Sequence, residues 1–312
     1  MRIFFCRSPK ISKKNTSSCI ATFGIFDGIH QGHIYLLKKL IAQAKTRKLK
    51  SLLINFSPHP LSFYKKKFLG YLTTDEEKIA LLRGLSLDYF WIIKFDRRIA
   101  KMEGEQFIEY IFKYFRIRKI IVGEDLKFGY KRRGNIEDLR KICKERDIKF
   151  QVIKKKKIEG HFVSSSLIRS LIRKAQFNLV EKFLGRPYSF RGEVLKGRKL
   201  GTKILTFPTL NINPKDKVLP PLGVYITLTK YKGRFYQSVT NLGEAPTFKK
   251  GRILLETHII NFNKNIYKDI IEVIFIKKIR EEKEFLSPFQ LKQQILKDIE
   301  SAKKFFSSHN IL

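Results

Sequence analysis

Two histidines and three glycines stand together near the start of the chain. The segment Gly-Ile-Phe-Asp-Gly-Ile-His-Gln-Gly-His runs from Gly24 to His33 and follows a short apolar run. Gly24 and Gly28 permit tight turns and close approach of the backbone to a ligand. Gly32 and His33 open a helical pattern, whose free N–H groups and positive dipole end favour phosphate. Three residues apart, His30 and His33 can both donate hydrogen bonds to phosphate oxygens, which requires positioning and electrostatics but no covalent intermediate.

The elements that must position this loop alternate along the first half of the chain. Five apolar runs read as buried strands, at 18–23, 51–56, 89–94, 119–123 and 149–153, and helical patterns lie between them. Thr74 with Glu77 is a capping-box signal that opens one of these helices. The alternation predicts a mainly parallel sheet with helices on both faces. Ligands in such sheets bind at the carboxyl ends of the strands.

The pattern changes after Gly185. Short β-rich segments follow one another, separated by Gly, Pro and Asn, which predicts an antiparallel sandwich or barrel. Ser287 and Pro288 then open an apolar-faced helix that closes the chain. A length of 312 residues agrees with two domains at about 150 residues each. We place the boundary between residues 184 and 185, so that the domains are 1–184 and 185–312.

The first domain resembles a known family of enzymes. Its His-x-Gly-His pair is similar to the signature of nucleotidyltransferases, in which two histidines bind ATP phosphates. Further segments are 55–60 (NFSPHP), 72–78 (LTTDEEK), 122–134 (VGEDLKFGYKRRG) and 164–172 (SSSLIRSLI). Together, over nearly all of residues 17–184, they resemble the N-terminal module of bifunctional prokaryotic riboflavin kinase/FAD synthetases. That module implies a Rossmann-like fold and adenylylation of FMN by ATP, with release of pyrophosphate.

The resemblance also implies site residues. His30 and His33 would be catalytic, and the ATP-binding residues would be Gly24, Phe26, Asp27, Gly28, Gly32, Ser164, Ser165, Ser166 and Arg169. Ser166 replaces the usual Thr and keeps the hydroxyl. The flavin would be lined by His59, Pro60, Asp125, Phe128 and Gly129. Two simpler interpretations stay open: the serines cap a helix, and Phe128 packs in the core.

The second domain resembles the riboflavin kinase module of the same family, a small Greek-key β-barrel. Phe-Pro-Thr-Leu-Asn at 207–211 matches the Pro-Thr-Ala-Asn signature, and the segments 219–225, 239–248, 255–262 and 279–285 follow in family order. By this resemblance Thr209 and Asn211 would contact Mg²⁺ and ATP, and Glu256 would accept the proton of the ribityl hydroxyl. Gly197, Gly201 and Pro208 would bind ATP. Without the resemblance, Glu256 reads as a solvated strand residue.

Several kinase positions depart from the family pattern. Thr206 stands where the family has Gly, and Thr202 replaces the Arg of a Gly-Arg pair. Asn261 replaces an Asp, and Lys268 replaces a Gly. A Cβ in place of glycine can strain a nucleotide loop. The implied function is synthesis of FMN and then FAD from riboflavin, with ATP as co-substrate and Mg²⁺ as cofactor. An FMN adenylyltransferase with a weakened or lost kinase is the alternative.

The composition raises a third possibility. The formal net charge is +37, from 65 Lys and Arg against 28 Asp and Glu. Such an excess is typical of nucleic-acid-binding proteins, but lysine is spread along the whole chain rather than clustered. We therefore attribute most of it to drift in composition, and expect small-molecule substrates without a specific nucleic-acid or membrane partner. The absence of a long apolar stretch, of a signal peptide and of metal-ligand spacing among three cysteines favours a cytoplasmic protein.

Overall fold

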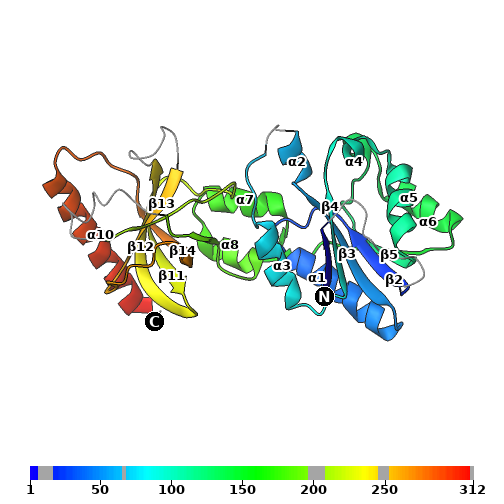
Figure 1. Ribbon diagram of the computed structural model, residues 1–312, viewed down its shortest axis with the longest axis horizontal. Coiled ribbons are helices and arrows are strands. Elements are labelled where there is room, and N and C mark those ends of the chain that lie inside the picture. The colour runs from blue at the N-terminus through cyan, green and yellow to red at the C-terminus, as the bar shows by residue number, and fades with distance from the viewer. Residues whose placement is uncertain (6–16, 65–67, 196–207, 245–252, 310–312) are drawn as a thin grey trace. The chain divides into compact units, whose positions relative to one another are not determined.

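The computed structural model describes residues 1–5, 17–64, 68–195, 208–244 and 253–309. The chain divides into two compact units, Met1–Ser165 and Ser166–Leu312 (Figure 1). No helix in these ranges is long and apolar enough to cross a bilayer. The domain boundary that we place at residue 184 lies after two helices of the second unit.

The first unit is built on a six-stranded parallel sheet, as the alternating pattern predicts. Its strands are β1 (Arg2–Phe5), β2 (Cys19–Phe23), β3 (Lys50–Ser57), β4 (Tyr89–Lys94), β5 (Ile117–Gly123) and β6 (Lys149–Ile153). Their order is β1-β4-β3-β2-β5-β6, with every pair parallel. The carboxyl ends of β2, β3 and β5 therefore share one edge, and each is followed by a predicted site segment. The pattern of apolar runs did not predict β1, which continues the sheet beside β4.

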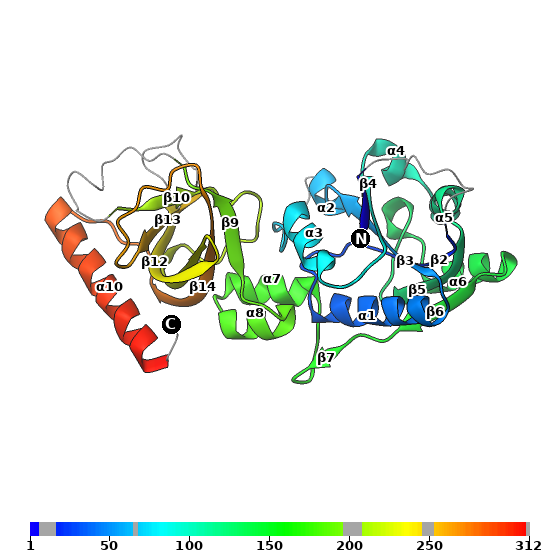
Figure 2. The ribbon, with the colours of Figure 1, turned by 60° about the horizontal axis from the view of Figure 1, so that its bottom comes forward.

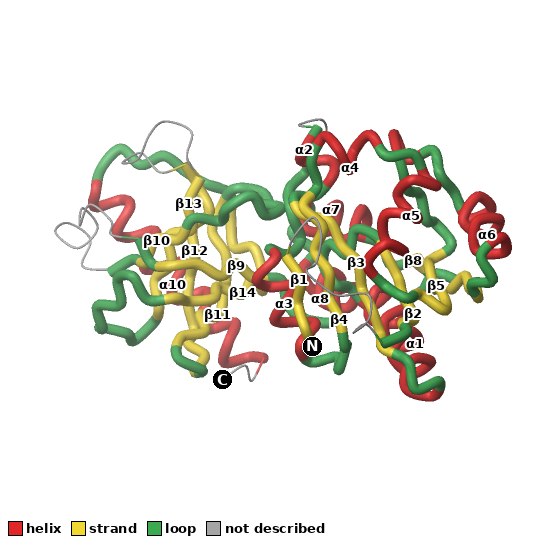
Figure 3. Tube along the Cα trace, turned by 45° about the vertical axis from the view of Figure 1, so that its right-hand side comes forward, coloured by secondary structure: helices red, strands yellow, loops and turns green. Residues whose placement is uncertain are grey.

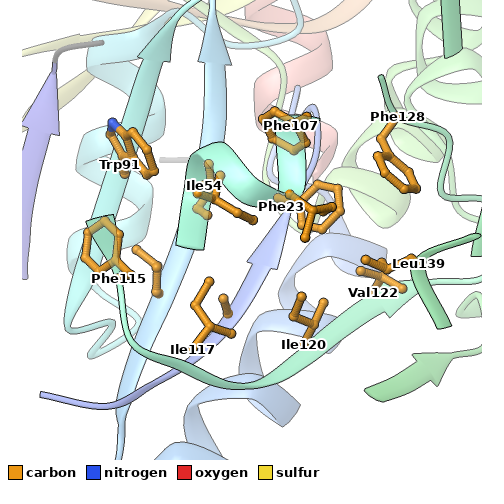
Figure 4. Packing of buried hydrophobic residues seen from close by; sticks show 14 of the residues in the cluster. Phe23, Ile54, Trp91, Phe107, Phe115, Ile117, Ile120, Val122, Phe128 and Leu139 are labelled. Carbon is orange, nitrogen blue, oxygen red and sulfur yellow. The ribbon is translucent and has the colours of Figure 1, made fainter. Parts of the chain in front are cut away.

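Helices cover both faces of this sheet (Figure 2). They are α1 (Gln31–Thr46), α2 (Pro60–Phe63), α3 (Asp75–Arg83), α4 (Arg97–Lys101), α5 (Gly104–Tyr114) and α6 (Ile136–Glu145), with a 3-10 turn η2 at Tyr130–Arg132 and a small hairpin of β7 (Lys157–Ile158) and β8 (His161–Phe162). Alternate strand residues point to opposite faces and build two cores. Side chains of α1 and α3 join one core, and those of α5 and α6 join the other (Figure 4). Thr74 and Glu77 form the predicted capping box.

The second unit begins with two helices and continues as an antiparallel barrel. Its elements are α7 (Ser165–Arg173), α8 (Phe177–Leu184), β9 (Ser189–Glu193), β10 (Leu210–Ile212), β11 (Gly223–Tyr231), β12 (Arg234–Glu244), β13 (Ile253–Ile259), β14 (Ile270–Arg280) and α10 (Pro288–His309). The strand order is β10-β13-β12-β11-β14-β9. A bridge between Leu195 and Asn211 brings the two edges together, so the sheet nearly closes. This is the small barrel that the β-rich pattern predicts (Figure 3).

The two faces of the barrel sheet differ in chemistry. On one face Val224, Ile226 and Val239 pack against the apolar side of α10. The other face carries a chain of fully buried hydroxyls that hydrogen-bond to one another, formed by Thr227, Thr229, Ser238, Thr240 and Thr257. Because each hydroxyl has a partner, these buried polar groups do not carry the cost of unpaired ones. The pairing register of the strands therefore determines which side chains lie on the face that packs against α10.

Two departures from the family pattern fall at turns. Asn261 and Lys268 both have a left-handed backbone, with φ of 57° and 69°. Asn tolerates this conformation, whereas a lysine there costs roughly 1–2 kcal/mol relative to the glycine that the resembled family has. The Lys268 N–H still donates to the Val194 carbonyl at 3.0 Å, so the turn is formed despite the Cβ.

Candidate active sites

The loop after β2 is held by the neighbouring strand β3. The Gly24 N–H donates to the carbonyl of Ile54 at 3.1 Å, and the Phe26 N–H donates to Oδ1 of Asn55 at 3.0 Å. Gly28 has φ of 92°, a conformation that glycine adopts without cost. The loop therefore reverses direction at the carboxyl edge of the sheet and places His30 at the start of α1.

The two histidines form a stacked pair at the N-terminus of α1. His30 is the N-cap, and its Nδ1 accepts a hydrogen bond from the His33 N–H at 3.2 Å. The imidazole centroids lie 3.6 Å apart with an interplanar angle of 14°. A Cβ on Gly32 would lie 3.2 Å from two atoms of the His30 ring. Glycine at this position therefore leaves room for the stack.

The environment keeps His33 neutral. Burial lowers the pKa of His33 well below its ordinary value, and the His30 ring and the Lys78 ammonium lower it further. Among the described residues, the buried Nδ1 of His33 has no hydrogen-bond partner. The first turn of α1, all of which is described, has no acidic side chain. An anion at this helix end would meet backbone N–H groups and two imidazoles, with no carboxylate in the first helical turn.

Asp27 connects this loop to the segment before α3. Its buried carboxylate accepts hydrogen bonds from the N–H groups of Leu72 and Thr73 at 3.0 and 3.1 Å. Thr73 in turn accepts from the Gly28 N–H at 3.0 Å. The Asp27 carbonyl receives the hydroxyl of Ser165 at 2.9 Å. Asp27 thus holds three segments of the site in place, and ATP contact by its carboxylate stays a prediction.

The predicted flavin residues divide between two further loops. His59 is a buried N-cap, and its Nδ1 accepts from the Leu61 N–H at 3.1 Å. Pro60 opens the short helix α2 after it. The His59 ring lies 5.2 Å from the ring of Phe68 and 6.3 Å from that of Tyr71. This aromatic group follows β3, at the same sheet edge as the histidine pair.

The loop after β5 carries the remaining flavin candidates. The Asp125 side chain is 63% exposed and pairs with Lys155 at 3.2 Å. Phe128 packs in the core, 5.7 Å from the ring of Phe23 (Figure 4). Gly129 has φ of 70°, and a Cβ there would lie 2.6 Å from the backbone nitrogen of Gly104. Phe128 and Gly129 therefore shape the loop through packing, and their contact with flavin stays a prediction.

The serine-rich segment lies at the start of α7. Ser165 is its first residue and the last residue of the first unit, and its hydroxyl donates to the Asp27 carbonyl. Ser166 and Arg169 lie on the same helix and belong to the second unit. Ser164 precedes the helix. Binding of triphosphate by these residues stays a prediction.

A second polar group lies on the barrel. Asn211 of β10 is directly opposite Glu256 of β13, which is directly opposite Asn241 of β12. Directly paired residues point to the same face, so these three side chains form one row. Asn241 lies two residues from Val239, which packs against α10. The row is therefore on the α10 face of the barrel.

The electrostatics of the row suit a cation and a base. Burial raises the pKa of Glu256, and the nearby carboxylate of Glu282 raises it further. Asn211 is 7% exposed, and among the described residues its Oδ1 has no hydrogen-bond partner. An orphaned buried amide oxygen opposite the carboxylate of Glu256 fits a hard cation such as Mg²⁺. Thr209 directly precedes β10 and is half-buried.

Sequence reasoning did not select Asn241 or Glu282. Asn241 joins the site through strand register, and Glu282 lies close to Gly243, where a Cβ would collide with its carboxylate. Both lie in segments that resemble the family, 239–248 and 279–285, but only the strand pairing of Asn241 and the proximity of Glu282 to Gly243 bring them to the site. Pro208 is exposed, and its carbonyl lies 3.1 Å from Nδ1 of His258. The predicted residues Gly197 and Gly201, with Thr202 and Thr206, lie outside the described residues.

Comparison with known proteins identifies both units. Residues 12–167 match the FAD synthetase family model, and residues 184–306 match the riboflavin kinase model. A bifunctional riboflavin kinase/FMN adenylyltransferase of Buchnera aphidicola subsp. Schizaphis graminum is 37% identical over 305 residues, covering 95% of this chain and 96% of the relative. The chain belongs to the bifunctional riboflavin kinase/FMN adenylyltransferase family. It catalyses both steps, with ATP as a substrate of each.

Other members of the family are nearly as similar. The enzyme of Haemophilus influenzae is 35% identical over 293 residues, covering 93% of this chain and 95% of the relative. That of Escherichia coli K12 is 33% identical over 299 residues, covering 95% of each chain. A solved structure described as a macrolide-efflux protein from Streptococcus pneumoniae matches with a TM-score of 0.82 and 24% identity, covering 96% of this chain and 98% of that one. This last similarity concerns the fold.

Proposed function

We propose that the stacked pair of His30 and His33 is the catalytic centre for adenylylation of FMN. A phosphate oxygen of FMN attacks the α-phosphorus of ATP, and the bond to the bridging oxygen breaks as pyrophosphate leaves. The backbone N–H groups at the start of α1 and the two imidazoles donate hydrogen bonds to the phosphate oxygens. The observation that carries this proposal is the stacked pair at a helix end without acidic side chains.

Riboflavin phosphorylation, the second activity of the same chain, is an internal control for this assignment. His30→Ala and His33→Ala should each lower FAD formation from FMN and ATP by at least about a hundredfold, as loss of a group that stabilises developing charge does. Riboflavin phosphorylation by the same preparations should be unchanged. His161→Ala, on the exposed strand β8, is the matched histidine control. FAD formation within a factor of three of the unmodified enzyme in both His variants would refute the assignment.

For riboflavin phosphorylation we propose that Glu256 is the general base. Its carboxylate accepts the proton of the ribityl hydroxyl as that oxygen attacks the γ-phosphorus, and ADP leaves. Partial burial beside Glu282 raises the pKa of Glu256, which makes it a better proton acceptor than an exposed carboxylate. Asn211 and Thr209 are the proposed Mg²⁺ ligands, supported by the orphaned oxygen of Asn211. When bound, the ion neutralises charge on the phosphates of ATP.

Substitutions on one face of the barrel test this second assignment. Glu256→Gln should lower the rate of FMN formation by about a hundredfold or more, while FAD formation from supplied FMN continues. Asn211→Ala should raise the Mg²⁺ concentration needed for half-maximal FMN formation. Glu193→Gln, on β9, is the matched carboxylate control. If Glu256→Gln phosphorylates riboflavin at the normal rate, Glu256 is not the general base and the assignment is refuted.

We also propose a cytoplasmic setting with small molecules as the specific partners. Burial raises the pKa of the Cys19 thiol to about 12 and that of Cys143 to about 11, so both are poor nucleophiles for disulfide exchange. Binding of RNA through the +37 charge should be nonspecific and lost at moderate salt. Filter binding with several RNA sequences at 50 and 300 mM KCl measures this. Sequence-selective binding that persists at 300 mM KCl would contradict the proposal.

A further inference from the structure

A buried lysine next to the histidine pair has no role in the functions described so far. Lys78, on α3, is 3% exposed. Its Nζ donates to Oδ1 of Asp75 at 3.2 Å. Among the described residues this is the one hydrogen bond of an ammonium group that has three protons to donate. Burying a charge is costly unless its hydrogen-bonding capacity is used, so the remaining protons suggest a ligand.

The position of Lys78 is tied to both loops of the adenylyltransferase site. Asp75, its partner, also accepts a hydrogen bond from the hydroxyl of Ser57, at the end of β3. The segment just before α3 holds Asp27 of the histidine loop through Leu72. The helix that carries Lys78 is therefore connected to the loop of His30 on one side and to the loop of His59 on the other.

The charge of Lys78 acts on the histidine pair. After burial and the His30 ring, the Lys78 ammonium is the third cause that lowers the pKa of His33. The ammonium is thus near enough to His33 for its charge to act on that imidazole. Lys156, whose Nζ lies 3.2 Å from Oε1 of Gln31, is a further cation at this helix end.

Bound polyphosphate requires more positive charge than the imidazoles supply. A triphosphate carries several negative charges at neutral pH, whereas His33 is neutral there and the α1 dipole is equivalent to roughly half a charge. We propose that Lys78 is a phosphate-binding residue of the adenylyltransferase site, with Asp75 orienting its ammonium towards an oxygen of ATP and of the product pyrophosphate. This inference rests on the proposed assignment of the His30–His33 site.

Pyrophosphate binding tests the inference without requiring catalysis. Isothermal titration of the full-length enzyme with magnesium pyrophosphate gives the dissociation constant, and pyrophosphorolysis of FAD gives the KM for pyrophosphate. Lys78→Met should weaken both by roughly ten- to a hundredfold, the effect of losing a charge-assisted hydrogen bond. Lys78→Arg should recover most of the affinity. The KM for FAD should change less than threefold.

A second lysine provides a matched control. Lys50 pairs with Asp88 at 2.8 Å at the opposite end of β3. Lys50→Met is the same chemical change in the same unit, and it should leave pyrophosphate affinity unchanged. Riboflavin phosphorylation should be unchanged in every variant, which shows that the rest of the chain is folded.

The outcomes separate a ligand role from a structural one. Pyrophosphate affinity of Lys78→Met within threefold of the unmodified enzyme would overturn the proposal. Asp75→Asn keeps the ammonium, so it should bind pyrophosphate within about fivefold. If Asp75→Asn loses as much affinity as Lys78→Met, the ion pair merely supports the fold and the proposal fails. If Lys78→Met does not fold, Lys78→Gln replaces it under the same criteria. Loss of the His30 assignment would appear separately, as FAD formation that survives His30→Ala.

Discussion

Asp27 offers the sharpest test of how the histidine loop is held. Asp27 is 1% exposed, and its carboxylate accepts hydrogen bonds from the N–H groups of Leu72 and Thr73, residues that are 1% and 2% exposed. Asp27→Ala removes the acceptor without giving these N–H groups access to water. The loop that carries the histidines then loses the carboxylate that joins it to the segment before α3, while the hydrogen bond from the Gly28 N–H to Thr73 remains. We expect FAD formation to fall and the first unit to be less stable.

The magnitude follows from the two orphaned donors. A buried N–H left without a partner costs about 1–3 kcal/mol, so the substitution should cost about 2–6 kcal/mol. With a urea dependence of about 2 kcal/mol per molar, this moves the unfolding midpoint down by about 1–3 M. Asp27→Asn keeps one oxygen in the same place. It should therefore lose less than half as much stability as Asp27→Ala.

Each activity reports on its own unit during denaturation. Pre-incubation in increasing urea, followed by assay of FAD formation and of FMN formation in the same samples, gives two midpoints. The midpoint for FAD formation should fall in Asp27→Ala, and that for FMN formation should stay unchanged. A shift of less than 0.3 M, or equal shifts for the Ala and Asn variants, would refute the reasoning that the backbone acceptors set the cost.

Three further predictions concern other parts of the structure. Gly129→Ala places a Cβ on a left-handed backbone and against the backbone of Gly104, so it should lower the free energy of unfolding by roughly 2–3 kcal/mol. Gly160 also has a left-handed backbone but lies in open space, so Gly160→Ala should lower it by about 1 kcal/mol. The urea midpoints of FAD formation compare the two variants. Glu282→Gln removes a carboxylate that raises the pKa of Glu256, so the acid limb of the pH–rate profile for FMN formation should move to lower pH, and an unmoved limb contradicts this. Asp298 is buried and its partner Arg280 is partly buried, so Asp298→Ala, which removes the carboxylate from this pair, should cost about 3 kcal/mol. The urea midpoint of FMN formation measures this, and a loss under 1 kcal/mol would contradict it.

The order of the elements and the location of the first site could be predicted from local sequence patterns. The alternation of apolar runs and helical patterns predicts the parallel sheet, because periodicity reflects which faces are buried. The segment from Gly24 to His33 is local: its strand, turn and helix start are adjacent in the chain. Thr74 and Glu77 are likewise three residues apart, and their capping box is formed as predicted.

Which distant residues join those motifs depends on the three-dimensional fold. Asn241 reaches Glu256 through strand register, and Lys78 lies near His33 through the packing of α3. Phe128 stands in a motif, yet its ring fills the core. Local sequence patterns reflect the conformational preferences of a residue and its neighbours in the chain. The polar row on the barrel and the position of the Lys78 ammonium depend instead on distant segments, which come together only when the apolar faces are buried.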